Sequence, residues 1–146
     1  LIFYINRGQE KNNLRDFIGA KADFYKAAKL DTQSGDAYNS LGSTKANLGD
    51  YKDAINDFDR AIELNHKNVL AYYNRGIAKS NLGDYKGAIN DFNEAIKLDP
   101  EYAKAYYGRG LAKAGLKDPA HAEEDYKMAF ALDYREELYN DANNIK

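Results

Sequence analysis

The stretch 71–100, AYYNRGIAKSNLGDYKGAINDFNEAIKLDP, decides the fold, because sequence of the same chemistry recurs 34 residues before it and 34 residues after it. Four copies follow without a gap, as residues 1–34, 35–68, 69–102 and 103–136, and the segment 137–146 remains. A fixed period in this range indicates a stacked array of supersecondary units. Among the columns with the same residue type in all copies are Tyr4, Tyr38, Tyr72 and Tyr106; Gly8, Gly42, Gly76 and Gly110; Leu14, Leu48, Leu82 and Leu116; Asp16, Asp50, Asp84 and Asp118; Ala20, Ala54, Ala88 and Ala122; Ala27, Ala61, Ala95 and Ala129; Leu30, Leu64, Leu98 and Leu132.

Each copy reads as a helix, a tight turn and a second helix. In the third copy, apolar residues recur at helical spacing until Gly83, a residue suited to the left-handed conformation just past a helix end. Asp84 follows as a candidate N-cap for the second helix, and Pro100 ends that helix. Because the turn is so short, we expect the two helices to lie antiparallel.

Small residues predict how the two helices pack. Gly76 on the first helix and Ala88 on the second leave room for close approach, and Tyr72 and Phe92 fill the space on either side. Glycine inside a helix costs about 1 kcal/mol relative to alanine, so a glycine at the same position in every copy indicates a steric need for it.

The last copy and the tail differ from this pattern. Proline follows the turn of the fourth copy, at Pro119, where its missing amide does no harm to a helix start. Residues 137–146 place Leu138, Ala142 and Ile145 on one helical face, which predicts a short capping helix over the last unit. The sequence begins without Met inside a helical pattern, and we therefore expect a fragment of a longer protein.

These residues resemble the tetratricopeptide repeat (TPR) family over essentially the whole chain. The resemblance implies one all-α domain, 1–146, a right-handed α-solenoid of four antiparallel helix-turn-helix repeats plus the short C-terminal capping helix. The chain departs from the family pattern in two ways. Arginine precedes the glycine in three copies, and lysine stands where a tyrosine is expected. The matching residues are Tyr38, Leu41, Gly42, Ala54 and Phe58 in the second copy, and Tyr72, Gly76, Ala88, Phe92 and Pro100 in the third.

The unusual arginines have candidate partners. Positions seven and eleven of a copy lie one turn apart on the first helix, and the antiparallel return brings an aspartate at position 23 to the same level. We therefore expect Arg75 to pair with Asp91 and Arg109 with Asp125, with the arginine stems packed on apolar surface.

Composition excludes several function classes. With 21 Lys and Arg against 23 Asp and Glu, no basic field exists to gather a nucleic acid, and we expect no such partner. No apolar run reaches membrane-spanning length, so no membrane insertion is expected. The absence of cysteine rules out disulfides but leaves the compartment open, with the cytoplasm favoured.

No catalytic set emerges from the sequence. His66 and His121 are the only histidines, and neither has a partner at metal-ligand spacing. The segment 108–110, Gly-Arg-Gly, lies inside a helix and follows no strand, so it is not a phosphate loop. We therefore expect no enzymatic activity, no cofactor and no metal site.

The resemblance implies that first helices line a concave groove that binds polypeptides. Asparagine amides both donate and accept hydrogen bonds, as the backbone of an extended peptide requires, and tyrosines with aliphatic neighbours anchor partner side chains. Two alternatives stay open: the asparagines are merely tolerated polar residues, and the tyrosines pack against a neighbouring helix or the tail. The candidate groove residues are Asn39, Tyr73, Asn74, Ile77, Asn81, Lys104, Tyr107 and Leu111.

Some members of the family bind the C-terminal carboxylate of heat-shock chaperones with a clamp of lysines, asparagines and an arginine. The best register of this clamp has two matches in five, and the arginine and one lysine are missing. We expect no carboxylate clamp here. The five positions hold Asn39, Ser43, Asn74, Lys104 and Gly108.

The sequence therefore predicts a non-catalytic scaffold for protein–protein interaction, which binds an extended peptide or a partner helix in the groove. Two alternatives remain. The array is a structural self-association unit, in which the apolar end 1–5 of one chain stacks on the tail of another, or it is the docking arm of an enzyme whose catalytic domain lies outside this sequence.

Overall fold

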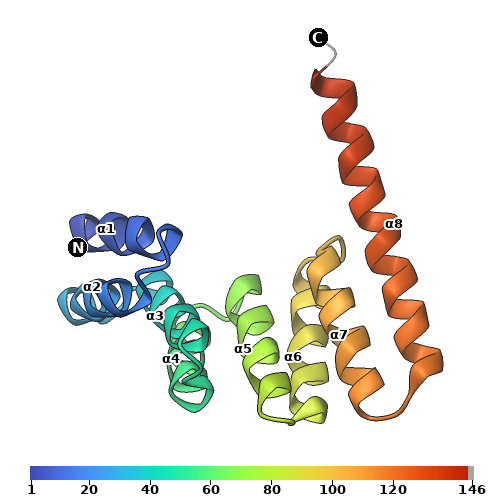
Figure 1. Ribbon diagram of the computed structural model, residues 1–146, viewed down its shortest axis with the longest axis horizontal. Helices are drawn as coiled ribbons and strands as arrows, with labels where there is room; N and C mark the ends of the chain where they lie inside the picture. The colour runs from blue at the N-terminus through green and yellow to red at the C-terminus, as the bar shows by residue number, and fades with distance from the viewer. Residues whose placement is uncertain (145–146) are drawn as a thin grey trace.

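The structure, a computed structural model, describes residues 1–144, and it describes side chains for residues 1–133. Within residues 1–144 all regular structure is helical, in eight α-helices (Figure 1). The helices are α1 (Ile2–Asn13), α2 (Phe17–Leu30), α3 (Gly35–Asn47), α4 (Tyr51–Leu64), α5 (Val69–Asn81), α6 (Tyr85–Leu98), α7 (Ala103–Gly115) and α8 (Pro119–Asn144).

Each helix packs against its neighbours in sequence. The pairs α1–α2, α3–α4, α5–α6 and α7–α8 form the hairpins, and the second helix of each hairpin also packs on the first helix of the next. Figure 1 shows the hairpins following one another from the N-terminus on one side of the molecule to α8 on the other. This arrangement is the predicted all-α helical repeat solenoid.

The turns inside the hairpins all pass through the left-handed region. Gly49 and Gly83 have φ of 85° and 81°, as the sequence predicted for Gly83. The first and fourth repeats place Arg15 and Lys117 at the same position, with φ of 61° and 62°. A side chain with a Cβ is strained in this region, so the turns of the second and third repeats are the relaxed ones.

The glycine column is explained by phenylalanines. Phe24, Phe58 and Phe92 are completely buried, one in each of the first three second helices. A Cβ on Gly76 would lie 2.8 Å from Cε1 of Phe92, closer than packed carbon atoms approach. The predicted steric need for glycine on the first helix is therefore confirmed.

Alanines form the contacts between repeats. Ala71 on α5 packs against Ala61 of the preceding repeat, and Ala105 on α7 belongs to the same buried cluster as Ala95. All four side chains are completely buried. The core is therefore a line of close helix contacts that continues from one repeat to the next.

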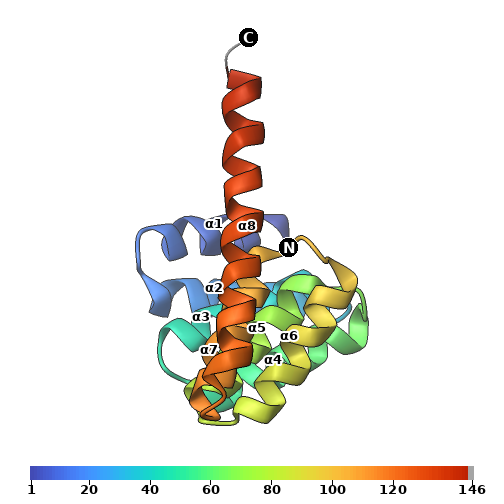
Figure 2. The same ribbon diagram turned by 90° about the vertical axis from the view of Figure 1, so that its right-hand side faces the viewer.

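The predicted capping helix is not a separate element. Residues 137–144 continue α8, which runs unbroken from Pro119 to Asn144 and extends past the other helices (Figures 1 and 2). The second helices of the first three repeats end in a turn where Asp31, Asn65 or Asp99 accepts a hydrogen bond from the amide two residues on. Asp133 occupies the same position as these three residues, but Tyr-Arg-Glu-Glu-Leu follows it without Gly, Pro, Ser or Asn, so helix propagation continues. Ile145 and the predicted contacts of Leu138 and Ala142 lie outside what the structure describes.

Candidate functional site

The candidate groove residues lie on three first helices that touch in order, α3, α5 and α7. At the end of this series, Tyr73, Lys104 and Tyr107 line a pocket of about 460 Å³. Tyr126 and Phe130 of α8 complete its apolar wall. The volume lies in the range of sites that accept a small molecule or a few side chains, roughly 300–1,000 Å³.

A second, smaller pocket lies one helical turn further along α5 and α7. It measures about 220 Å³, and Ile77, Asn81 and Leu111 line it. Leu111 follows Tyr107 by four residues, and Ile77 follows Tyr73 by the same interval. Residues four apart share a helix face, so the two pockets follow the same face of α5 and α7.

The two tyrosines differ in how much of the ring is free. Tyr73 is half-buried, with its ring edge-on to Tyr102 at a centroid distance of 5.3 Å and tilted against Phe92 at 6.0 Å. Burial raises the pKa of the Tyr73 phenol. Tyr107 packs against Tyr126 on one side, yet 54% of it is exposed. The alternative that tyrosines pack within the array therefore describes Tyr73 better than Tyr107.

The asparagines already have partners inside the chain. Asn74 Nδ2 donates to Asn39 Oδ1 at 3.2 Å, which joins α5 to α3, and Asn81 Nδ2 donates to the carbonyl of Ile77 at 2.9 Å. An amide side chain offers two N–H donors and an acceptor, so each retains capacity for a further bond. Asn39 and Asn74 do not line either of the two pockets.

The packing of α7 explains the missing clamp arginine. Gly108 is buried, and a Cβ there would lie 2.8 Å from Cε1 of Phe92. An arginine at this position would displace the buried phenylalanine ring. Lys104, the one clamp lysine present, is exposed at the edge of the larger pocket.

The predicted arginine–aspartate pairs are confirmed. Arg75 donates through Nε and Nη2 to the two oxygens of Asp91 at 2.9 and 2.7 Å, and Arg109 does the same with Asp125 at 2.9 and 2.6 Å. Burial acts to raise the pKa of Asp125, but the bonds from Arg109 and Lys113 outweigh it and lower the pKa. These pairs fix the hairpins and lie outside both pockets.

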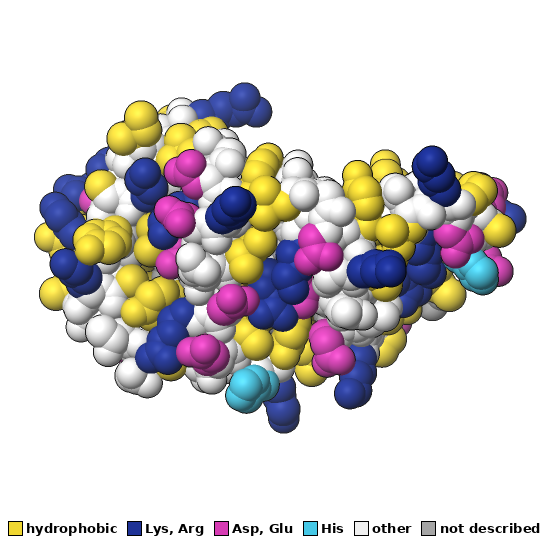
Figure 3. Space-filling model, turned by 90° about the horizontal axis from the view of Figure 1, so that it is seen from below, with side chains coloured by type: hydrophobic (Ala, Val, Ile, Leu, Met, Phe, Trp, Pro, Cys, Tyr) yellow, Lys and Arg dark blue, Asp and Glu magenta, His cyan; other side chains and the backbone are white. Residues whose placement is uncertain are grey.

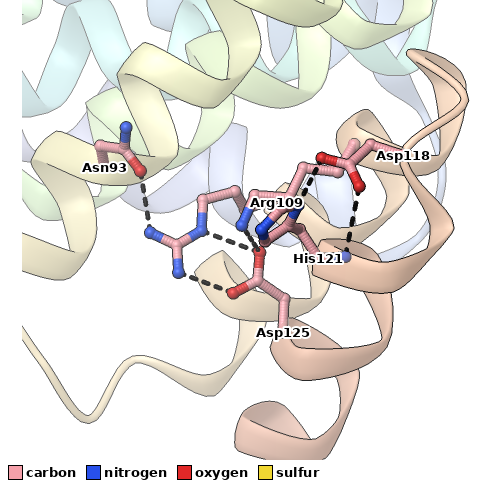
Figure 4. A network of polar contacts seen from close by, with 6 residues as sticks. Asn93, Arg109, Asp118, His121 and Asp125 are labelled. Atoms are coloured by element: carbon pink, nitrogen blue, oxygen red, sulfur yellow. Dashed lines mark hydrogen bonds and ion pairs between the residues drawn. The ribbon is translucent and has the colours of Figure 1, made fainter.

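Each of these two arginines also makes a contact that the sequence reasoning missed. Arg75 Nη1 donates to Asp59 of the preceding repeat at 2.7 Å, and Arg109 Nη1 donates to Asn93 at 2.8 Å (Figure 4). The signal was present, because Asp59 and Asn93 occupy position 25 of their copies. The arginines thereby tie successive repeats together.

Both histidines lie on the exposed surface. His121 Nδ1 lies 2.7 Å from Asp118 Oδ2 in the exposed first turn of α8, and this contact lowers the pKa of Asp118 (Figure 4). His66 is exposed. Among the described residues no group of three or more His, Cys, Asp and Glu side chains is placed to hold a metal ion.

The described surface carries charges of both signs. Figure 3 shows Lys and Arg side chains interspersed with Asp and Glu and with hydrophobic side chains over the face in view. Among the described residues, no helix combines the length and apolar character that crossing a membrane requires.

Comparison with known proteins identifies the repeat. The TPR repeat family matches residues 45–83 and 81–116. A crystal structure of MamA superimposes with a TM-score of 0.85 at 28% identity, covering 93% of this chain and 80% of that one. TTC0263, a thermophilic TPR protein of Thermus thermophilus, shares the fold with a TM-score of 0.81 at 24% identity, covering 88% and 72% of the two chains.

One similar structure contains a ligand. The second TPR of Spaghetti (RPAP3), bound to the HSP90 peptide SRMEEVD, superimposes with a TM-score of 0.67 at 29% identity and covers 73% of this chain and 98% of that one. No curated protein sequence matches this chain.

Proposed function

We propose that this chain, which belongs to the tetratricopeptide repeat family, is a protein-interaction scaffold that binds an extended peptide or a partner helix along α5 and α7. In this proposal the chain supplies a surface and performs no chemistry. The partner lies over the two pockets, with apolar side chains in them and its backbone near the asparagines.

The observation that carries the proposal is the exposed apolar face of α7. Tyr107 is 54% exposed and Leu111 is 48% exposed, and both line pockets on the same side of the helix. Large side chains that stay accessible beside a preformed hollow are typical of positions that dominate binding energy. A tyrosine also offers a hydroxyl at the rim, where a partner backbone passes.

Polar groups at the two pockets indicate which residues of a partner fit beside its apolar anchors. Lys104 and Asp133 line the larger pocket, and Asn81 lines the smaller one. An acidic side chain of the partner next to its apolar anchor fits Lys104, and a carbonyl fits the free amide hydrogen of Asn81. We expect the partner to carry an aromatic or aliphatic residue beside an acidic one.

The partner differs from a peptide held by its C-terminal carboxylate. Spaghetti shows that a domain of this fold binds a peptide, but Gly108 leaves no room here for the clamp arginine. Affinity for one short peptide is expected to be modest, on the order of micromolar, because ordering the ligand offsets much of the contact energy.

The test selects peptides from a displayed random library on this chain and measures their affinity by fluorescence anisotropy. We expect Leu111→Ala and Tyr107→Ala each to weaken a selected peptide by about tenfold, the cost of truncating a buried anchor. Leu82→Ala is the matched control, since Leu82 is 45% exposed but lines neither pocket. Unchanged affinity in both groove variants, or an equal loss in the control, contradicts the proposal.

A further inference from the structure

Three of the four repeats share one buried arrangement of charge. Position 23 of each repeat, on the second helix, holds an aspartate, and in these three repeats it is contacted by a lysine at position 11 and an arginine at position 7, both on the first helix. In the third repeat, Lys79 Nζ lies 3.0 Å from Asp91 Oδ2, and Arg75 binds both oxygens of the same carboxylate. Thus one carboxylate accommodates two cations at once.

The second repeat keeps the aspartate and the lysine but has lost the arginine. Leu41 stands where Arg7, Arg75 and Arg109 stand in the other copies. Lys45 Nζ lies 2.7 Å from Oδ2 of Asp57, and among the described residues this lysine is the one cation that contacts the carboxylate. Burial raises the pKa of Asp57, and Lys45 offsets this only in part.

A pocket lies beside Leu41 and Asp57 in the second repeat. It measures about 340 Å³, and Asp57, Lys45, Leu41, Tyr25 and Tyr38 are among the residues that line it. Only 13% of the Asp57 side chain is exposed. The pocket therefore combines two aromatic walls with a nearly buried carboxylate that has no arginine partner within residues 1–133.

The third repeat shows which group occupies the equivalent position. Shifting by one repeat maps Leu41 to Arg75, Asp57 to Asp91, Tyr38 to Tyr72 and Tyr25 to Asp59. The Arg75 guanidinium carbon lies 5.7 Å from the ring centre of Tyr72, and its nitrogens bind Asp91 and Asp59. At the equivalent place, the second repeat retains the carboxylate and the tyrosine that contact the guanidinium.

We propose that this pocket binds the guanidinium group of an arginine side chain supplied by a partner polypeptide. Asp57 accepts its hydrogen bonds, and the rings of Tyr38 and Tyr25 flank its plane. The site lies between α2, α3 and α4, separate from the pockets on α5 and α7. This proposal therefore does not depend on the groove proposal.

Two lysines at the pocket do not exclude a further cation. Lys45 has its counterparts in Lys79 and Lys113, and each of those shares its aspartate with an arginine. Lys29 lines the pocket, and its counterparts by sequence position are Glu63 in the repeat before Arg75 and Lys97 in the repeat before Arg109. Their repulsion makes the binding weak, as suits one arginine among the contacts of a larger partner.

Arg60 of the same repeat already places its guanidinium near the ring of Tyr38. Its guanidinium carbon lies 6.0 Å from the ring centre of Tyr38, while its nitrogens contact Glu63 and the carbonyl of Thr32. Arg60 is thus held at the rim by these contacts and leaves Asp57 to the incoming group.

The test is a titration of the whole, isotopically labelled chain, followed by amide chemical shifts in NMR spectra. The probe is the blocked tripeptide acetyl-Gly-Arg-Gly-amide, and the matched control replaces arginine by citrulline, which has the same shape without the charge. We expect the arginine peptide to shift amides around the pocket and to bind at least about tenfold more tightly than the citrulline peptide.

Two variants test the pocket itself. Leu41→Arg fills the pocket with the chain's own guanidinium. It introduces the residue that the three other copies carry at this position, so the fold is expected to persist. Asp57→Asn removes the charge. Both are expected to weaken the arginine peptide by at least about tenfold.

Three results overturn the proposal: equal binding of the citrulline peptide, undiminished binding to Leu41→Arg, or shifts confined to α5 and α7. The last of these would still support the groove. Equally tight binding of free arginine would overturn the assignment to a polypeptide partner.

Discussion

The second and third repeats have nearly the same backbone but differ in how their polar groups are satisfied. In the third repeat, Asp91 is 3% exposed and receives two hydrogen bonds from Arg75 beside its contact with Lys79. In the second, Leu41 replaces the arginine, and Asp57 has only Lys45 for a charge partner. A repeated fold thus tolerates the loss of one member of its buried charge network.

The same two repeats differ at the start of their second helices. Asp84 accepts a hydrogen bond from the amide of Gly87 at 3.0 Å, whereas Asp50 makes no such side-chain bond. A Cβ at Gly87 would collide with the Asp84 carboxylate, and Asp53 has a Cβ at that position. The third repeat is therefore the better-satisfied unit at both places, and the difference predicts how each responds to substitution.

The largest effect is expected from removing the aspartates. Asp91→Ala leaves Arg75, whose side chain is 18% exposed, without its main partner. Breaking a buried pair in this way costs about 3–5 kcal/mol of unfolding free energy. Asp57→Ala leaves only Lys45, whose flexible stem can carry its charge to water, and about 1 kcal/mol is expected. Urea unfolding measures both, and equal losses would mean that the two carboxylates are equivalent.

The second largest effect on stability is expected from exchanging the residues at position seven between the second and third repeats. Arg75→Leu gives the third repeat the pattern of the second, and the loss of charged hydrogen bonds is expected to cost about 1.5–3 kcal/mol. Leu41→Arg is the reciprocal change and is expected to raise the midpoint of urea unfolding, since it supplies the missing donors to Asp57. A fall in stability for Leu41→Arg would show that the apolar contacts of Leu41 with Ala20 and Phe24 matter more.

A smaller difference is expected at the helix starts. Asp84→Ala removes a side-chain bond to an orphan amide and is expected to cost about 1 kcal/mol, whereas Asp50→Ala is expected to cost only a few tenths. Thermal unfolding of the two variants beside the parent chain checks this. Matching losses would indicate that charge near the helix N-terminus, rather than the hydrogen bond, is what stabilises both helices.

The smallest effect concerns pH. Burial raises the pKa of Asp57 above its unfolded value, so the ionised carboxylate costs stability, and that cost is relieved as the pH falls through the folded pKa. Although burial opposes it, bonding from Arg109 and Lys113 lowers the pKa of Asp125, so its ionised form contributes stability that is lost as the pH falls.

Variants lacking each carboxylate are therefore expected to change in opposite directions. Relative to the parent chain, Asp57→Asn gains stability as the pH rises from about 3 to 6, and Asp125→Asn loses it. The neighbouring charges are Lys45 and Asp53 for Asp57, and Arg109 and Lys113 for Asp125. Urea unfolding across this range measures both slopes, and slopes of the same sign would contradict the expectation.

Much of the fold was predictable because repetition makes each local signal appear several times. The period gave the hairpins, Gly83 and Asp84 marked a turn and a cap, and the spacing of Arg75 and Asp91 predicted their pairing. The cross-repeat bond from Arg75 to Asp59 was not predicted, since it depends on how one hairpin rotates against the next. The prediction that the tail forms a separate helix was wrong, because a helix end needs a local stop signal and residues 134–139 provide none.

The candidate site divides in the same way. The residues 73, 77, 107 and 111 could be placed on one face from spacing alone, because a helix turns every 3.6 residues. The accessibility of these side chains could not be predicted from spacing. Tyr73 and Tyr107 occupy the same position in successive copies, yet only Tyr73 has Tyr102 packed against it.

The sequence by itself determined what repeats: helix periodicity, turn residues, the glycine column and the charge pairs within a hairpin, all of which depend on neighbours at fixed separations. Only the tertiary structure decided what is left open. Whether Tyr107 is covered and whether a hollow remains beside Leu41 depend on side chains of different repeats meeting in space, and no spacing along the chain specifies that distance.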